Sequence, residues 1–142
     1  MKISEIMKQS VITVAPDDTA LTASRLLSRH NIGSLPVCTG DGRIKGIVTD
    51  RDIVLRCVAS GKSPDITPVS DIMSTNIISV SPTDEVSAAA SLMSTEKIRR
   101  LPVVDKGKVA GMLSLGDIAK SRSFSMEAAK ALTDISTNVT KR

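Results

Sequence analysis

The chain of 142 residues is almost without aromatic side chains: it contains one Phe and neither Tyr nor Trp. It therefore lacks the rings on which proteins stack the bases of single-stranded nucleic acid. Hydrophobic residues still make up 41% of the chain and charged residues 24%, which is ordinary for a globular protein. The core must consist of aliphatic side chains, and the length is that of one average domain.

Soft metal ligands and disulfide partners are equally scarce, because the chain has two Cys and one His. This set is too small for a disulfide scaffold or for a four-ligand zinc site. Cys38 and Cys57 are best interpreted as small buried apolar residues, with a redox pair as the alternative. His30 follows a helical pattern, where a capping or surface role fits better than that of a general base.

No apolar run approaches the ~18–20 residues of a membrane span, and residues 1–5 lack the apolar stretch of a secretory signal. We expect a cytoplasmic protein without a membrane partner. The net charge of +4 suits a small anionic ligand. No run of Lys and Arg is long enough to indicate a nucleic-acid arm, so nucleic-acid binding rests on the basic charge alone.

Sequence patterns of catalysis are also missing. The chain has no evident Ser/His/Asp set, no Cys/His pair, no Walker sequence and no Gly-x-Gly-x-x-Gly loop. We therefore expect no enzyme activity, no catalytic residue and no metal site.

The most informative feature present is an internal duplication. Residues 4–37 align without a gap with residues 70–103, and both segments contain Ile-Met near the start and Leu-Pro-Val at the end. After the loss of one residue in a turn, the match runs on to Ile53 over Ile118. The predicted organisation is repeat 1 at residues 1–60, a Gly-, Pro- and Ser-containing linker at 61–68, repeat 2 at 69–121 and a C-terminal helical extension at 122–142.

Each repeat predicts the order β-α-β-β-α, an α/β (α+β) fold in which two copies pack about a pseudo-twofold axis. The first strands are expected at 11–14 and 77–80, and Asp18 or Asp84 is the candidate N-cap of the following helix. A hairpin and a closing helix that begins at Asp50, or near Leu115, complete each repeat. The expected apolar stripes are Ala20, Ala23, Leu26 and Leu27; Val86, Ala89, Leu92 and Met93; and, in a helix over 125–138 that lies on the body or on a partner chain, Met126, Ala129, Leu132 and Ile135.

The duplicated element with chemical content is a strand that runs into a helix through Thr/Ser-x-x-Asp, at Thr49–Asp52 and Ser114–Asp117. One interpretation is a capping box, in which hydroxyl and carboxylate satisfy the first free N–H groups of the helix. The other is a nucleoside site, in which the Asp accepts hydrogen bonds from a ribose diol. A phosphate then needs a cation, which Arg99 and Arg100 supply in repeat 2, whereas repeat 1 has Gly33 and Ser34.

These motifs, in this order and in two copies over about residues 3–121, resemble a tandem pair of cystathionine β-synthase (CBS) domains, a Bateman module. The resemblance implies two clefts between the copies that bind adenosine derivatives such as AMP, ADP, ATP or S-adenosylmethionine, and assembly into a homodimer. By position it implies ribose and phosphate contacts from Thr49, Asp52, Ser114, Asp117, Arg99 and Arg100. It also implies a base pocket lined by Ile12, Thr13, Ser34, Val48, Ile78, Ser79 and Leu113.

The leading hypothesis is a regulatory sensor that binds an adenosine-containing ligand and signals by a change of conformation. No obligatory cofactor is expected, since the nucleotide or S-adenosylmethionine acts as a regulatory ligand. The signal passes through the dimer or an unidentified effector protein. The alternative is a ligand-free dimeric interaction scaffold, in which the Thr/Ser-x-x-Asp elements are helix caps only.

Overall fold

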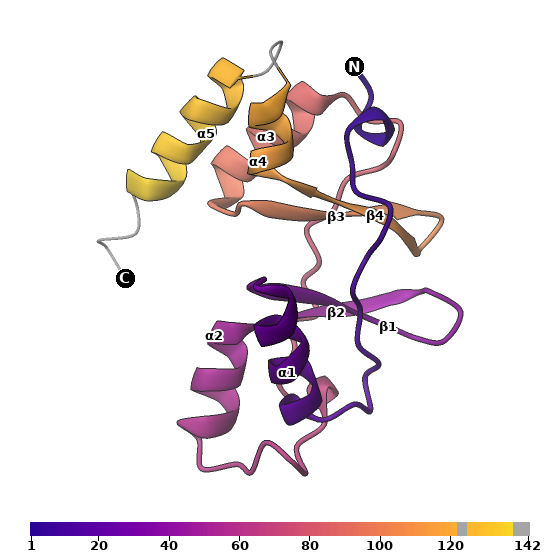
Figure 1. The fold of residues 1–142 in the computed structure, drawn as a ribbon, viewed down its shortest axis with the longest axis vertical. Helices are drawn as coiled ribbons and strands as arrows, with labels where there is room; N and C mark the ends of the chain where they lie inside the picture. Colours follow the sequence, from indigo (N-terminus) through magenta and orange to yellow (C-terminus); the bar gives the residue numbers. More distant parts are fainter. Residues whose placement is uncertain (122–124, 138–142) are drawn as a thin grey trace. The chain divides into compact units, whose positions relative to one another are not determined.

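A computed structural model describes residues 1–121 and 125–137 and contains the predicted mixture of helices and strands (Figure 1). Its elements in chain order are η1 (Ile3–Glu5), α1 (Ala20–His30), β1 (Ser34–Cys38), β2 (Ile44–Thr49), α2 (Asp50–Asp52), η2 (Ile53–Val58), η3 (Val69–Asp71), α3 (Val86–Glu96), β3 (Arg100–Asp105), β4 (Lys108–Ser114), α4 (Leu115–Lys120) and α5 (Ser125–Thr137). Strand β1 pairs with β2, and β3 pairs with β4. Asn138, the last residue of the predicted C-terminal helix, lies outside the described residues.

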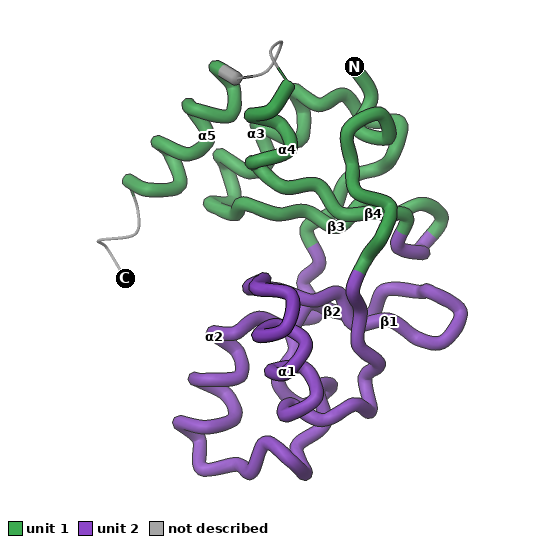
Figure 2. The backbone as a smooth tube through the Cα atoms, viewed as in Figure 1, with its two compact units in different colours: residues 1–11, 78–106, 110–142 green, residues 12–77, 107–109 purple. Residues whose placement is uncertain are grey.

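The chain divides into two compact units that do not follow the repeat boundaries (Figure 2). Unit 1 comprises residues 1–11, 78–106 and 110–142, and unit 2 comprises residues 12–77 and 107–109. Each unit therefore combines the body of one repeat with the opening segment of the other.

Backbone pairing holds the opening segment of each repeat, called the exchanged segment below, in the unit formed by the other repeat. In unit 1, Lys8 and Met112 exchange two N–H···O bonds of 2.9 Å. In unit 2, Ile47 and Ser74 do the same at 2.9 and 2.8 Å. The segments approach this closely because a glycine faces each of them: a Cβ at Gly111 would lie 2.7 Å from the Lys8 carbonyl oxygen, and a Cβ at Gly46 would lie 2.7 Å from that of Ser74.

The strands predicted at 11–14 and 77–80 shrink to single parallel bridges, Val14 with Val37 and Val80 with Val103. Val14 donates to the Pro36 carbonyl at 3.1 Å and accepts from the Cys38 N–H at 2.8 Å. A bridge of one residue satisfies one donor and one acceptor, and the chain then leaves the sheet. The prediction of full strands was wrong in length, although the pairing partner is the Leu-Pro-Val strand of the same repeat body.

The predicted N-caps Asp18 and Asp84 were also wrong. The N-cap of α1 is Thr19, whose hydroxyl accepts from the Thr22 N–H at 3.2 Å, and the N-cap of α3 is Glu85. The Asp18 carboxylate instead accepts from the Ala15 N–H at 2.8 Å. Asp84 does the same with the N–H of the residue three positions before it, at 2.8 Å. Each Asp thus closes the turn that precedes the helix, a common use of this short acceptor.

Each unit has its own aliphatic core. The stripes predicted for the first helix of each repeat are confirmed: Ala20, Ala23, Leu27, Val86, Ala89 and Met93 are buried, and Leu26 and Leu92 are half-buried. The closing helices begin where predicted, at Asp50 and Leu115. Within the described residues no helix has both the length and the apolar character needed to cross a membrane.

Helix α5 packs on α3 and α4 of unit 1, but not through the predicted face. Its buried residues are Ala128, Ala131 and Ile135, while Met126 is 82% and Leu132 41% exposed. The predicted face was therefore wrong except at its last position. The predicted residues are spaced by three throughout, and such a series moves gradually around a helix of 3.6 residues per turn. The buried residues are spaced by three and then by four, which keeps them on one face.

Candidate ligand site

Both Thr/Ser-x-x-Asp elements form complete capping boxes. In unit 2, the Thr49 N–H donates to Asp52 Oδ2 and the Asp52 N–H donates to Thr49 Oγ1, both at 3.0 Å. In unit 1, the Ser114 N–H donates to Asp117 Oδ2 at 2.9 Å, and the Asp117 N–H donates to Ser114 Oγ at 3.1 Å. The reciprocal hydrogen bonds that the capping interpretation requires are therefore present at both elements.

The caps engage only one oxygen of each Asp. The other oxygen of Asp52 lies 3.8 Å from Arg56 Nε, and that of Asp117 lies 3.9 Å from Lys8 Nζ. Arg56 lies one turn further along the same helical segment, a spacing that sequence analysis could have flagged. Lys8 comes from the exchanged N-terminal segment, so no local pattern points to it. In each unit, one carboxylate oxygen thus faces a cation at a partly exposed position.

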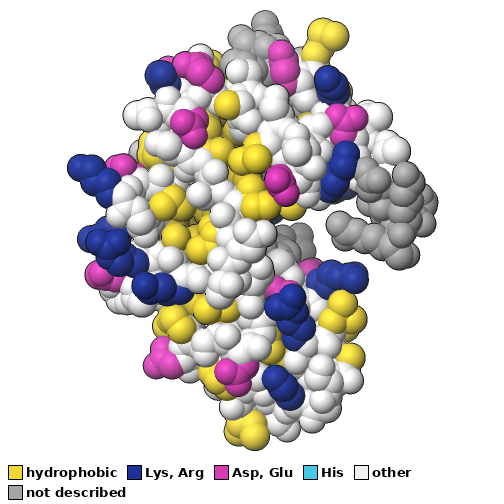
Figure 3. All heavy atoms as spheres, turned by 180° about the vertical axis from the view of Figure 1, so that it is seen from behind, with side chains coloured by type: hydrophobic (Ala, Val, Ile, Leu, Met, Phe, Trp, Pro, Cys, Tyr) yellow, Lys and Arg dark blue, Asp and Glu magenta, His cyan; other side chains and the backbone are white. Residues whose placement is uncertain are grey.

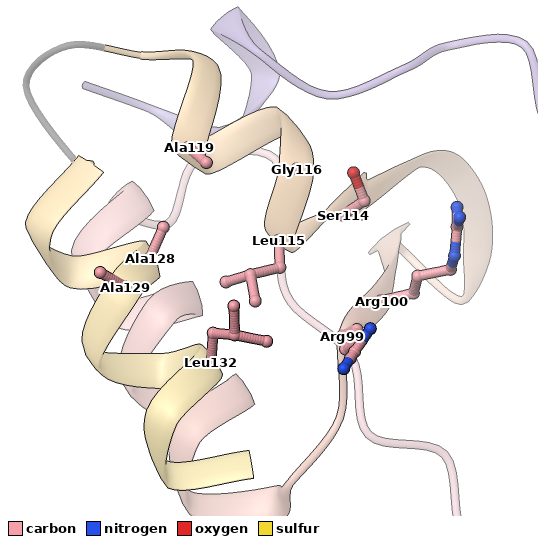
Figure 4. A pocket seen from close by; sticks show the side chains of 9 residues that line it. All are labelled: Arg99, Arg100, Ser114, Leu115, Gly116, Ala119, Ala128, Ala129 and Leu132. Atoms are coloured by element: carbon pink, nitrogen blue, oxygen red, sulfur yellow. The ribbon is translucent and has the colours of Figure 1, made fainter. Parts of the chain in front are cut away.

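A pocket of about 470 Å³ in unit 1 brings together Arg99, Arg100 and Ser114 (Figure 4). The Leu115 N–H donates to the Arg99 carbonyl at 2.8 Å, which ties the start of β3 to the start of α4 and places both arginines beside Ser114. The remaining wall is apolar and consists of Leu115, Gly116, Ala119, Ala128, Ala129 and Leu132. Sequence analysis missed this wall, because α5 and α4 meet only in the folded unit. Asp117 follows the lining residue Gly116 in the sequence but does not itself line the pocket.

The equivalent region of unit 2 has the same backbone tie without the cations. The Asp50 N–H donates to the Gly33 carbonyl at 3.1 Å, and a Cβ at Gly33 would lie 3.6 Å from the Asp50 carboxylate. A smaller pocket of about 330 Å³ lies against α1 and the closing helix, lined by Ser24, Leu27, Ser28, Ile32, Asp50, Ile53 and Val54. The two units therefore differ chemically at corresponding places, as the sequence predicted from Gly33-Ser34 and Arg99-Arg100.

The residues named for a base pocket are divided between the two units, with four in unit 2 and three in unit 1. Unit 2 contains Ile12, Thr13, Ser34 and Val48, and unit 1 contains Ile78, Ser79 and Leu113. Val48 and Leu113 are fully buried within the two cores, so their side chains offer no surface to a ligand. Ile12, Ser34 and Ile78 are half-buried, and Thr13 and Ser79 are exposed. Only these five have side-chain surface to contribute.

The remaining reactive side chains take no part in these pockets. Cys38 and Cys57 are free, buried thiols, and burial raises the pKa of the Cys38 thiol. Cys57 lies 3.6 Å from the Lys62 carbonyl. His30 is the exposed last residue of α1. No group of three or more His, Cys, Asp or Glu within residues 1–121 and 125–137 is arranged to hold a metal ion.

Charged side chains of both signs are interspersed on the face of the molecule drawn in Figure 3. Lys and Arg side chains have Asp and Glu among them instead of forming one basic stripe there. A protein that binds duplex nucleic acid clusters its basic residues on one face or along one helix. The face in Figure 3 does not have that distribution.

The CBS domain family model matches the chain twice, at residues 3–58 and 69–123. The chain belongs to the CBS domain family. The two matched segments correspond to the two predicted repeats. CBS domain-containing protein YhcV of Bacillus subtilis (strain 168) is 41% identical over 134 residues, a length that covers 94% of each chain.

Solved structures of CBS proteins share the fold and include adenosine ligands. The CBS domain protein PAE2072 from Pyrobaculum aerophilum, complexed with AMP, is 30% identical with a TM-score of 0.78; the match covers 91% of this chain and 98% of that one. The CBS domain pair of protein MJ0100, in complex with 5-methylthioadenosine and S-adenosyl-L-methionine, is 29% identical with a TM-score of 0.73, covering 84% and 94%. Similar CBS pairs thus bind adenosine derivatives.

Proposed function

We propose that the protein is a regulatory sensor that binds an adenosine-containing ligand at its Thr/Ser-x-x-Asp elements and responds by a change of conformation. The observation that carries this proposal is the unit 1 pocket that gathers Arg99, Arg100 and Ser114. Arginine suits phosphate because its planar fork of donors matches phosphate oxygens. The AMP complex of a similar CBS protein supports the same ligand class.

In this proposal the Asp side chains have two simultaneous tasks. Oδ2 of Asp117 caps α4, while Oδ1 accepts from the ribose hydroxyls, and Asp52 does the same in unit 2. The neighbouring cations Lys8 and Arg56 lie close enough to contact a ligand there. In unit 2, Ile12, Thr13 and Ser34 would contact the base of a ligand bound there. In unit 1, Ile78 and Ser79 would contact the base of a ligand bound to that unit. Since only unit 1 has the arginine pair, a phosphate-bearing ligand should prefer unit 1.

A ligand-free interaction scaffold is the second candidate, and a specific observation favours it. Both capping boxes are complete without any ligand, with all four hydrogen bonds between 2.9 and 3.1 Å. On this view Thr49, Asp52, Ser114 and Asp117 stabilise helix starts and nothing more.

Calorimetric titration with AMP, ATP and S-adenosylmethionine separates the two candidates when it is done on Asp117→Ala as well as the wild type. Both candidates predict that Asp117→Ala loses about 0.5–1.5 kcal/mol of stability, because the Ser114 N–H loses its acceptor. Only the sensor predicts a loss of binding at one site. Thr19→Ala is the matched control, because it removes the cap of α1 at similar expense and leaves these elements untouched. No heat for any of the three ligands at millimolar concentration would reject the sensor.

We further propose that the protein acts as a homodimer and passes its signal to an effector protein. Sedimentation velocity with and without AMP tests the first part. A monomer at all concentrations, with and without nucleotide, would contradict it.

A further inference from the structure

The unit 1 pocket has two chemically different halves. Arg99, Arg100 and Ser114 supply cations and a hydroxyl. The other half is apolar, and in Figure 4 the side chains of Leu115 from α4 and Leu132 from α5 point toward one another. A phosphate and a ribose would use only the first half, so the proposed function leaves the apolar wall without a task.

Helix α5 is the element that makes this wall specific to unit 1. It lies beyond residue 123, where the second match to the CBS domain family ends, and repeat 1 has no counterpart of it. It contributes Ala128, Ala129 and Leu132 to the lining. The volume of about 470 Å³ is within the range of small-molecule sites, which are mostly apolar with a few placed polar groups.

We propose that α5 is part of the ligand site. In addition to its contacts with Ile78 and Ser79, the base of an adenine nucleotide packs one face against Leu132 and Ala129, while the phosphate lies at Arg99 and Arg100. Leu132 is 41% exposed, so it retains apolar surface that a ligand can cover. This inference rests on the proposed function, because it assigns a further specificity-determining residue to the same ligand.

The packing of α5 makes ligand binding and helix docking interdependent. Among the α5 residues whose burial the structure describes, Ala128 and Ala131 bury only methyl groups and Ile135 buries a large side chain. A hydrogen bond from the Ser94 hydroxyl to the Asp134 carboxylate adds one polar contact with α3. A ligand that touches α4, β3 and α5 together adds to the contacts that hold α5. By linkage, a docked α5 raises ligand affinity by the same factor.

The test is calorimetric titration of the full chain with AMP and ATP, comparing Leu132→Ser with Met126→Ser. Both side chains have exposed surface, but Met126 is 82% exposed and does not line the pocket, whereas Leu132 does. Loss of a half-exposed leucine contact predicts an affinity about five- to tenfold lower for Leu132→Ser. Met126→Ser should bind as the wild type does. Amide exchange over residues 125–137 provides the second readout, and nucleotide should slow it in the wild type.

Three results would overturn the inference, and they are distinguishable. Unchanged affinity in Leu132→Ser, with the wild type binding normally, removes the role of α5 and leaves the proposed function intact. Equal weakening in both serine variants shows that α5 acts through helix stability and not through contact. No binding to the wild type removes the proposed function and this inference together.

Discussion

Replacing Gly111 by Ala should destabilise unit 1 strongly. The new Cβ would lie 2.7 Å from the Lys8 carbonyl oxygen and 2.8 Å from Met7 Sδ, both inside van der Waals contact. The Met7 side chain can move, but the carbonyl belongs to the bridge with Met112, whose two hydrogen bonds are 2.9 Å long. The methyl group therefore pushes the N-terminal segment away from β4.

The magnitude follows from the terms that change. Overpacking at a rigid contact costs about 1–3 kcal/mol. Two strained hydrogen bonds are worth about 0.5–1.5 kcal/mol each. The lower chain entropy of the unfolded Ala variant returns about 0.4–1 kcal/mol. The terms sum to a loss of about 1–5.5 kcal/mol, and the central value of about 3 kcal/mol lowers Tm by roughly 12–24 °C in a unit of this size.

Thermal unfolding followed by far-UV circular dichroism measures this change, since the chain has no Trp to serve as a fluorescent probe. Gly46→Ala should behave alike in unit 2, because its Cβ would lie 2.7 Å from the Ser74 carbonyl oxygen. Gly40→Ala is the control, because nothing lies within 4 Å of its Cβ, and it should stay within about 0.5 kcal/mol of the wild type. Equal Tm values for Gly111→Ala and Gly40→Ala would refute the close approach of the exchanged segment.

Three further expectations concern a cap, a docked helix and a thiol. Thr49→Ala should lower the free energy of unfolding by about 1 kcal/mol in urea titration, as it removes the acceptor of the Asp52 N–H; an unchanged midpoint would contradict the cap. Ile135→Ala should lower the free energy of unfolding by about 2–4 kcal/mol and speed amide exchange in α5, whereas Met126→Ala should do neither. Similar unfolding free energies for the two variants would mean that α5 is not docked through Ile135. Burial raises the pKa of the Cys38 thiol, so iodoacetamide near pH 8.5 should alkylate Cys38 more slowly in the native protein than in urea, and equal rates would show an accessible thiolate. The stability that the neutral thiol contributes is present below the unfolded-state pKa and is lost as pH rises through the native-state pKa.

The duplication allowed much of the fold to be predicted from sequence. The repeat matches, the hairpins, the starts of the closing helices and the aliphatic core all follow from local patterns that occur twice. The extent of the first strands did not follow, because Val14 and Val80 each pair for a single residue before the chain turns away. The caps at Asp18 and Asp84 failed because a carboxylate at that position can close the preceding turn instead.

Long-range features could not be predicted in the same way. Nothing in the sequence around Lys8 indicates that its ammonium group lies beside Asp117. The face of α5 that is buried depends on the helices against which α5 packs, and the spacing of its apolar residues alone predicted the wrong face. The Thr/Ser-x-x-Asp elements show the opposite situation, because the sequence predicted their capping boxes and the structure contains both. The nucleoside interpretation of the same residues stays a prediction.

The exchange of opening segments between the repeats bears on any attempt to divide the gene. A cut in the linker yields two fragments, and the first residues of each fragment belong to the unit formed by the other fragment. Residues 1–11 of the first fragment pack in unit 1, and the residues of the second fragment up to 77 pack in unit 2. Either fragment alone would display an unpaired strand edge and an incomplete interior, which favours aggregation. Mixed in equal amounts they could rebuild the whole, so the linker is a natural position for a split-protein reporter.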